Sequence, residues 1–194
     1  MAFLPPADLA AIGFARCGRN VLISDKASIY NAANIHIGSN VRIDDFAVLS
    51  AGDGGIHIGS YVHIGVFASL IGNGRIELAD FCGLSGRVSI YSSSDDFSGE
   101  ALTNPTVPEA LAAVVHQDVL LGCHVIVGSG SVLLPGAVLE TGVAVGALSL
   151  VNRRCREFGI YYGRPVRRIG ERGRTLLDLE KRVPAGDDGA GEQA

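Results

Sequence analysis

The segment from Tyr91 to Glu100 holds the densest group of chemically competent side chains in the sequence. Asp95, Asp96 and Glu100 place three carboxylates within six residues, beside the flexible Gly99. Carboxylates at this spacing can orient an amine and hold its ammonium form, which suits a reaction in which an amine is the nucleophile. A solvated acidic turn is the alternative interpretation, because segments of Asp, Ser and Gly also favour turns.

A six-residue repeat of aliphatic side chains surrounds this segment and must position it. A fixed period determines the architecture before any local propensity is weighed. A period of six residues does not fit an α-helix, which needs an apolar residue every three or four positions. The repeat places these residues before and after the acidic segment: Ile23, Ile29, Ile35, Ile37, Ile43, Leu49, Ile58, Ile64, Leu70, Leu78, Leu84 and Ile90, then Leu121, Val127, Leu133, Leu139, Val145 and Val151.

The repeat predicts a three-sided, parallel β-solenoid, in which six residues form one short strand with its corner and three such units form one coil. We expect the aliphatic residues to point inward. Glycines that follow them, such as Gly38, Gly59 and Gly128, are expected at corners whose backbone conformation Gly adopts cheaply. The alternative, a β-sandwich, would show turn signals about every 8–12 residues. Smaller residues are expected to fill the remaining inner space: Ala27, Val41, Ala47, Val62, Ala68, Cys82, Val88, Val125, Ser131, Ala137, Val143 and Ser149.

The solenoid is predicted to span residues 21–166, with an inserted loop at 91–118. Residues 1–20 are predicted to form a helical cap and residues 167–183 a second helix. Residues 184–194 are rich in Gly, Ala and acidic side chains and are predicted to be disordered.

Both flanking helices are predicted from local signals. A helix from Pro5 to Arg16 is expected because Asp8 can cap it and good helix formers follow. The second helix is expected because Ile169 and Leu176, with the leucines that follow, recur at helical spacing among alternating charges.

Composition narrows the class of protein. A chain of 194 residues that is 47% hydrophobic can bury one good core, so a single domain is expected. The net charge of −4 gives no reason to expect a nucleic-acid partner. No apolar run approaches the roughly 20 residues that span a bilayer, and the first residues lack the pattern of a signal peptide. The sequence therefore predicts a cytoplasmic protein without a membrane partner.

The cysteines and histidines do not predict a metal site. Cys17, Cys82, Cys123 and Cys155 are far apart, so they form neither a zinc pattern nor a disulfide framework, and reduced thiols are expected. The five histidines are not spaced to place three ligands on one centre.

Several segments resemble a known family. LGCHVIVGSGSVLLPGAVLETGVAVGALSLVN, from Leu121 to Asn152, and GIYYGRPVRRI, from Gly159 to Ile169, resemble the hexapeptide-repeat acyltransferases. That family has a left-handed parallel β-helix and binds acyl-CoA between three subunits. Within it, ISDKASIY, SNVRIDDFAVLS and VSIYSSSDDFSGEALTNPT are similar to enzymes that acylate nucleotide-linked 4-amino-4,6-dideoxyhexoses, above all the dTDP-4-amino-4,6-dideoxyglucose N-acetyltransferases of O-antigen synthesis.

The resemblance implies an all-β homotrimer with active sites between subunits and no bound cofactor. Its cosubstrate would be acetyl-CoA, and the acceptor would be the 4-amino group of a sugar linked to a nucleotide, expected to be dTDP. In related sugar O-acetyltransferases a catalytic His occupies the position of Asp95. A hydroxyl needs a good base, whereas an amine need only lose its proton near neutral pH. Asp95 and Glu100 would therefore hold the amine, with Asp96 sharing that role or supporting the loop.

The resemblance also implies a CoA channel. It places Cys123 near the pantetheine, the backbone of Ala147 along the pantetheine arm, and Asn152 and Pro165 at the adenine end. Arg167 and Arg168 would hold the 3′-phosphate, since guanidinium makes forked, charge-assisted contacts with phosphate. The alternative for these arginines is a solvated helix start that pairs with Glu171.

The sugar nucleotide is expected to meet Arg87 and Tyr91, at the last coil before the insertion. Arg42, Asp44 and Asp45 are expected on a face shared between subunits. The proton acceptor stays open at this point. The departing CoA thiolate could take the proton directly, and His116 and His124 are the competing side chains, although a corner His such as His124 is more often a surface residue.

Two other function classes stay open. A sugar or antibiotic O-acetyltransferase would share the fold and the CoA site, but it should carry a His in the insertion, and none precedes His116. A noncatalytic trimeric solenoid would not need the arginine-bearing loop at 163–168. A relative of the carbonic anhydrases would need zinc-binding histidines on neighbouring coils, which these five do not offer.

Overall fold

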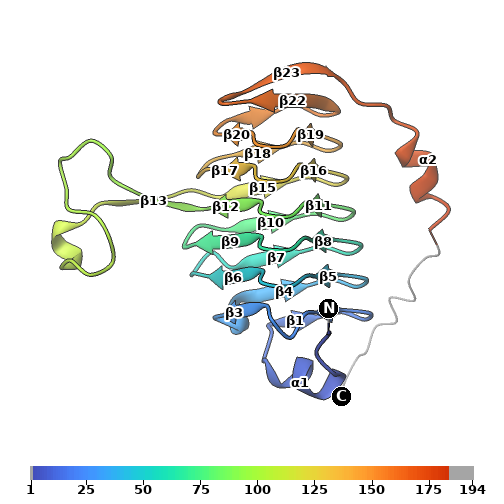
Figure 1. Cartoon of the computed structure of the whole chain (residues 1–194), viewed down its shortest axis with the longest axis horizontal. Helices are drawn as coiled ribbons and strands as arrows, with labels where there is room; N and C mark the ends of the chain where they lie inside the picture. Colours follow the sequence, from blue (N-terminus) through green and yellow to red (C-terminus); the bar gives the residue numbers. More distant parts are fainter. Residues whose placement is uncertain (1, 184–194) are drawn as a thin grey trace.

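Short parallel strands stacked in coils form the body of the molecule (Figure 1). The computed structural model describes residues 2–183. Successive strands along the chain belong to three different sheets, so the chain winds around a three-sided prism. The predicted β-solenoid is confirmed.

Each of the three sheets extends along the stack of coils. The first sheet contains β1 (Arg16–Cys17), β4 (Ile35–Ile37), β7 (Ile56–Ile58), β10 (Ile76–Leu78), β15 (Val119–Leu121), β18 (Val138–Leu139) and β21 (Arg154–Cys155). The second contains β2 (Leu22–Ile23), β5 (Arg42–Ile43), β8 (His63–Ile64), β11 (Gly83–Leu84), β16 (Ile126–Val127), β19 (Ala144–Val145), β22 (Gly159–Gly163) and β23 (Val166–Glu171). The third contains β3 (Ser28–Tyr30), β6 (Val48–Ala51), β9 (Ser69–Gly72), β12 (Ser89–Tyr91), β17 (Val132–Leu133) and β20 (Leu150–Val151).

The aliphatic repeat fills the core. Every aliphatic position of the repeat is buried except Ile29, and every smaller inner residue is buried except Ala27. The strand register places equivalent positions of neighbouring coils next to each other. Ile43 pairs with Ile64, and Gly83–Leu84 pairs with Ile126–Val127 although the insertion separates them in sequence. Burial of each such side chain contributes about 1.5–3 kcal/mol, so the repeat stabilises the same cross-section at each coil.

The glycines at strand ends serve close packing between coils, and the sequence-based reason for them is wrong. None of Gly38, Gly59 and Gly128 has a positive φ. A Cβ on Gly38 would lie 2.6 Å from the carbonyl carbon of Gly59 in the next coil, closer than any real Cβ contact. Positive φ at the corners is adopted by other glycines, such as Gly130, Gly136 and Gly142, and by many residues with side chains, among them Asn40, Phe46, Tyr61, Phe67, Phe81, Arg87, His124 and Leu148.

The N-terminal helix is shorter than predicted. Helix α1 spans Pro6–Ala11, its N-cap is Pro5, and it has no side-chain cap because Asp8 lies inside the first turn. Gly13, with φ of 79°, follows the helix, and β1 then begins at Arg16. A 3₁₀ turn, η1 (Ala32–Asn34), precedes β4.

The predicted helix at residues 167–183 is wrong over its first part. Val166–Glu171 form β23, which runs antiparallel to β22, because pairing with the last coil outweighs the local helical spacing. Val166 is buried and Ile169 is 67% exposed, so the apolar side chain of Ile169 does not pack against the solenoid as the predicted helix required. Only α2 (Leu176–Glu180) is helical. No helix in the described part of the chain is long and apolar enough to cross a membrane. The predicted disordered tail at 184–194 lies outside the described residues.

The insertion leaves the solenoid after β12 and projects to one side, as Figure 1 shows. Strand β13 (Ser93–Asp95) pairs antiparallel with β14 (Val114–His116), and between them lies the 3₁₀ turn η2 (Glu109–Leu111). We call residues 92–117 the hairpin insertion. Its base is fixed by buried Ser92, whose Oγ donates to the carbonyl of Gly74 at 2.7 Å and whose carbonyl accepts from the N–H of Gln117 at 3.0 Å.

Candidate active site

Asp95 ends the first strand of the hairpin insertion and is exposed. Its partner across the strand pair is Val114, and two residues nearer the solenoid Ser93 pairs with His116. The Oγ of Ser93 lies 2.8 Å from the Nδ1 of His116. Because directly paired residues in antiparallel strands point to the same side, the carboxylate of Asp95 and the side chain of Val114 share one face of the hairpin.

An open cavity of about 580 Å³ lies beside Asp95. The lining residues come from the hairpin strands, the segment between them and the end of β9: Ile71, Ser93, Ser94, Asp95, Asn104, Pro105, Val107, Glu109, Ala112 and Val114. Glu109 thus shares the cavity with Asp95, and Glu100 is not among the lining residues. No sequence signal identified Glu109, because its place depends on the loop folding back so that the N–H of Leu102 donates to the carbonyl of Leu111 at 2.8 Å.

Asp96 is engaged within the loop. Its Oδ2 accepts from the backbone N–H groups of Gly99 and Glu100 at 3.0 Å and of Ala101 at 3.2 Å, and its Oδ1 accepts from that of Ser98 at 2.9 Å. These hydrogen bonds, that from Ser98 first, lower the pKa of Asp96 to about 2. Of the two roles predicted for Asp96, its geometry favours support of the loop.

The histidines predicted as competing bases lie in different environments. His116 sits on the hairpin and bonds Ser93. His124 is buried, which corrects its expected surface position, because α2 covers it. Its Nε2 lies 2.8 Å from Oε2 of Glu180, and its ring stacks on Phe81 with centroids 4.9 Å apart. His124 therefore ties α2 to the solenoid.

Arg87 and Tyr91 lie at opposite ends of β12, Arg87 in the corner before the strand and Tyr91 at its last position. Arg87 occupies the corner between the second and third sheets, with φ of 61° and its guanidinium 5.6 Å from the ring centroid of Phe67. Tyr91 ends β12 and is 36% exposed. The two residues therefore attach to the third sheet at opposite ends of one strand.

The residues expected along CoA are divided among the corners of the prism. Ala147 lies at the corner between the second and third sheets, and the loop containing Pro165 is fixed there. The N–H of Gly163 donates to Oγ of Ser149 at 3.1 Å, and Nε of Arg164 donates to the carbonyl of Leu148 at 2.8 Å. Asn152 follows β20 at the next corner, between the third and first sheets.

Cys123 lies at the remaining corner, between the first and second sheets. It lines a cavity of about 430 Å³ on the first sheet, together with the stacked rings of His36 and His57, whose centroids are 4.6 Å apart. Burial raises the pKa of the Cys123 thiol. One chain therefore does not bring Cys123 and Ala147 into a single channel.

Arg167 and Arg168 are exposed on β23 rather than at a helix start. Arg168 forms an ion pair with Glu171, which is the alternative that the sequence offered to phosphate binding. Arg167 pairs in strand register with Tyr162 of β22.

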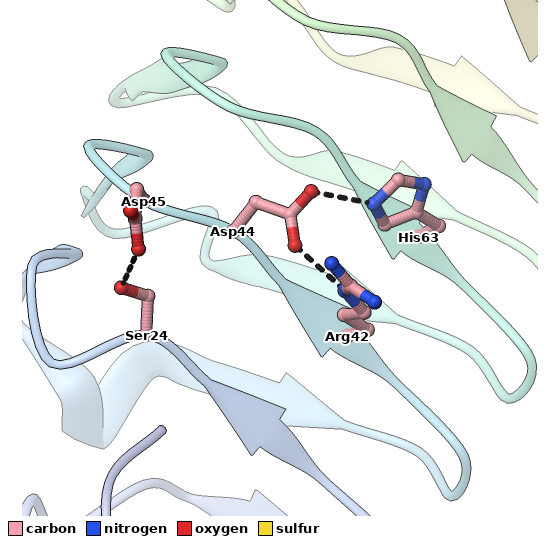
Figure 2. Close-up of polar contacts among 5 residues, drawn as sticks. All are labelled: Ser24, Arg42, Asp44, Asp45 and His63. Carbon is pink, nitrogen blue, oxygen red and sulfur yellow. Dashed lines mark hydrogen bonds and ion pairs between the residues drawn. The ribbon is translucent and has the colours of Figure 1, made fainter. Parts of the chain in front are cut away.

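A buried carboxylate organises basic side chains on the second sheet (Figure 2). Asp44 accepts from Nε of Arg42 at 2.7 Å and lies 2.9 Å from Nε2 of His63, and its side chain is only 8% exposed. Burial raises the pKa of Asp44, but the hydrogen bonds from Arg42 and His63 outweigh it, so this pKa lies below its ordinary value. Within residues 2–183, no group of His, Cys, Asp or Glu has the arrangement of a metal site.

Comparison with known proteins identifies the family. No family model matches the chain. The dTDP-4-amino-4,6-dideoxy-D-glucose acyltransferase of Escherichia coli is 48% identical over 180 residues, which are 93% of this chain and 94% of that protein. The chain belongs to the dTDP-4-amino-4,6-dideoxyglucose acyltransferase family. The resemblance seen in the sequence is thereby confirmed, and the chain is an acyl-CoA-dependent nucleotide-sugar N-acyltransferase.

Solved structures agree with this dTDP-4-amino-4,6-dideoxyglucose acyltransferase assignment. The N-acyltransferase AntD from Bacillus cereus, in complex with dTDP and coenzyme A, is 46% identical, with a TM-score of 0.88 over 93% of this chain and 96% of that one. Another AntD structure contains dTDP and 3-hydroxybutyryl-CoA, at 44% identity and a TM-score of 0.88, over 93% of this chain and 95% of that one. A maltose O-acetyltransferase from Clostridium difficile, 20% identical with a TM-score of 0.58 over 86% of this chain and 74% of that one, shares the fold.

Proposed function

We propose that this protein transfers an acyl group from acyl-CoA to the 4-amino group of dTDP-4-amino-4,6-dideoxyglucose, and that Asp95 holds the amine and accepts its proton. The amine attacks the thioester carbonyl and forms a C–N bond. Asp95 takes the proton that the nitrogen loses, and the C–S bond then breaks. The departing thiolate takes that proton and leaves as CoA thiol, so protons and charges balance. The observation that carries the proposal is the carboxylate of Asp95 at a cavity, in a chain of this family.

The spacing of substituted residues in AntD supports Asp95. AntD has been solved with one aspartate or one serine replaced, bound to CoA with dTDP or with dTDP-4-amino-4,6-dideoxyglucose, and these two positions are ten residues apart in that chain. Ser85 and Asp95 are also ten residues apart in this chain. Ser85 lies at the corner between the second and third sheets, and its N–H donates to the carbonyl of Val127 at 2.9 Å. Sequence analysis missed Ser85, because a Ser in a corner looks like any turn residue.

A homotrimer with sites between subunits explains how Ser85 and Asp95 can cooperate. Within one chain, Ser85 precedes the last strand of the third sheet before the insertion and Asp95 follows it, at the other edge. The hairpin insertion also exposes large apolar side chains that a partner subunit would cover, with Phe97 94% and Leu111 55% exposed. We therefore propose that the hairpin of one subunit carries Asp95 to the corner that bears Ser85 and Ala147 in its neighbour. A cytoplasmic location is part of the proposal, since acyl-CoA is a cytoplasmic cosubstrate.

Thiol release tests the reaction. Acetyl-CoA and 3-hydroxybutyryl-CoA are each incubated with a panel of dTDP-, UDP- and GDP-linked amino sugars, and with simple hydroxyl sugars. Release with dTDP-4-amino-4,6-dideoxyglucose is expected, and Asp95→Asn should reduce kcat by about 10²–10⁴-fold. Asp25→Asn, at an exposed corner distant from the insertion, is the matched control. Turnover of hydroxyl sugars without turnover of any amino sugar would overturn the proposal.

Subunit mixing tests the shared site. Asp95→Asn and Ser85→Ala are expected to be inactive separately. If the two residues come from different subunits, random one-to-one trimers regain about a quarter of the wild-type sites. A mixture that stays inactive, with subunit exchange shown by mass spectrometry, would place both residues in one subunit.

A further inference from the structure

The cavity beside Asp95 is lined by acidic, polar and aliphatic side chains. Two carboxylates, Asp95 and Glu109, line it together with the polar side chains of Ser93, Ser94 and Asn104. The remaining lining is aliphatic and comes from Ile71, Pro105, Val107, Ala112 and Val114. Such a cavity offers both carboxylates and aliphatic side chains to the same ligand.

The charge of the lining excludes the phosphate parts of both substrates. Of the described residues that line this cavity, none is Lys, Arg or His. A diphosphate placed beside Asp95 and Glu109 would meet like charge, which costs several kcal/mol across an interface. An ammonium group meets opposite charge there. An uncharged acyl chain gains nothing from the carboxylates, so the lining matches an amino sugar better than an acyl group.

One aliphatic side chain of the lining lies directly beside the carboxylate of Asp95. Val114 is the cross-strand partner of Asp95, so a ligand amine held by Asp95 has the branched side chain of Val114 at its side. In a 4-amino-4,6-dideoxyhexose, the methyl at C6 is attached to the ring carbon next to the one that bears the amine. A methyl and an amine at this separation match an apolar side chain next to a carboxylate.

We propose that this cavity is the pocket for the sugar ring, in which Val114 and its aliphatic neighbours select the 6-deoxy sugar and Glu109 is a second carboxylate for the amine or an adjacent hydroxyl. The inference rests on the proposed function, because it takes the amino sugar as the acceptor. A 6-hydroxyl against these aliphatic side chains would lose its water without gaining a partner. Apolar pockets discriminate against an added hydroxyl by about 10²-fold, and we expect a preference of that order for the 6-deoxy sugar.

A matched pair of threonine variants tests the selection. Val114→Thr and Val115→Thr each replace a methyl with a hydroxyl at neighbouring positions of β14, whose side chains point to opposite faces and are 43% and 52% exposed. The measurement is the ratio of kcat/KM for dTDP-4-amino-4,6-dideoxyglucose to that for its 6-hydroxy analogue. Val114→Thr should lower this ratio about 10-fold, while Val115→Thr leaves it unchanged. An unchanged ratio in Val114→Thr, with amino-sugar turnover intact, overturns the pocket but not the proposed function.

A second measurement separates the sugar from the acyl group as occupant. The preference between acetyl-CoA and 3-hydroxybutyryl-CoA is measured in the same variants. A shift of acyl preference in Val114→Thr, without a shift of sugar preference, would show that the cavity holds the acyl chain and would overturn the inference. For Glu109→Gln, calorimetric binding of dTDP-4-amino-4,6-dideoxyglucose should weaken about 10-fold while the KM for acyl-CoA stays constant. Equal binding by Glu109→Gln and wild type would remove Glu109 from the pocket.

Discussion

Asp95 and Val114 lie directly opposite each other where the hairpin insertion meets its cavity. The pair holds a charged and an apolar side chain at a fixed separation, because both belong to one two-stranded ladder whose base is hydrogen-bonded to the solenoid through Ser92. A loop without this ladder could carry the same residues but could not hold them in register. The hairpin therefore gives an exposed carboxylate a defined position on a rigid body.

Substitution of Asp96 should loosen the loop without unfolding the protein. In Asp96→Asn the charge that four backbone N–H groups share is lost, so we expect faster hydrogen exchange at residues 98–101 and a raised KM for the sugar nucleotide. Since the folded pKa of about 2 lies below the ordinary value of 3.8, the support is complete above that ordinary value and is lost as pH falls through about 2. Hydrogen exchange by mass spectrometry checks this. Unchanged exchange at these residues would show that Asp96 does not hold the loop.

The contacts of Asp44 should stabilise the coils that contain β5 and β8 at neutral pH. Asp44→Asn leaves Arg42 and His63 without the charge they now share, and we expect a loss of about 1 kcal/mol, since both basic side chains are half exposed. The pKa of Asp44 is lowered, so its contribution is present above the ordinary carboxyl value of 3.8 and is lost as pH falls below it. By urea unfolding, the difference in free energy of unfolding between wild type and variant should be present at pH 7 and become smaller near pH 3. An equal difference at both pH values would show that the charge of Asp44 does not cause the stabilisation.

Arg167 and Arg168 should respond differently to removal of the 3′-phosphate of CoA. If either guanidinium binds that phosphate, its Ala variant raises the KM for acetyl-CoA but has little further effect with acetyl-dephospho-CoA. We expect the larger effect, about 10-fold, for Arg167→Ala, because Glu171 already pairs with Arg168. The KM of wild type and of each variant is measured by steady-state kinetics with each of the two cosubstrates, which gives a double-mutant-type cycle. If the ratio of the variant's KM to the wild-type KM is the same for acetyl-CoA and for acetyl-dephospho-CoA, that arginine does not contact the 3′-phosphate.

A methyl group between coils should be costly. Gly38→Ala places a Cβ within 2.6–2.8 Å of backbone atoms of Gly59 and Ser60, so the coils must separate, and we expect a loss of about 3 kcal/mol in the free energy of unfolding. Gly173→Ala is the control, because a Cβ there meets nothing within 4 Å. Thermal and urea unfolding measure both. Equal stability of Gly38→Ala and wild type would show that the coils can separate at little cost.

The fold was predictable because the same packing recurs at each coil. Once Ile43, Ile64 and Leu84 are recognised as equivalent, each inward position predicts the next along the whole repeat. The end of the chain was not predictable in this way. Residues 167–171 belong to the segment predicted as a helix, but pairing with β22 determines their structure, and that pairing joins them to the last coil rather than to the leucines that follow in sequence.

The candidate site was predictable where composition alone points to chemistry. Asp95 stands out because carboxylates gather at the one long interruption of the repeat in the sequence. Glu100 and Glu109 are equally acidic, and only the folding of the loop brings Glu109 to the cavity. The residues expected to contact CoA follow one another in sequence but lie at three corners of a prism, so sequence proximity gave no guide to which of them lie close together.

The antiparallel turn from β22 into β23 also settles where the stack of coils ends. A stack of parallel strands offers the same edge at each level, and further copies could in principle continue it into a fibre. The final strand of the second sheet runs in the reverse direction, so an incoming parallel coil meets a mismatched edge. The second sheet thus ends in an edge that does not match a parallel coil, which disfavours end-to-end stacking through that sheet.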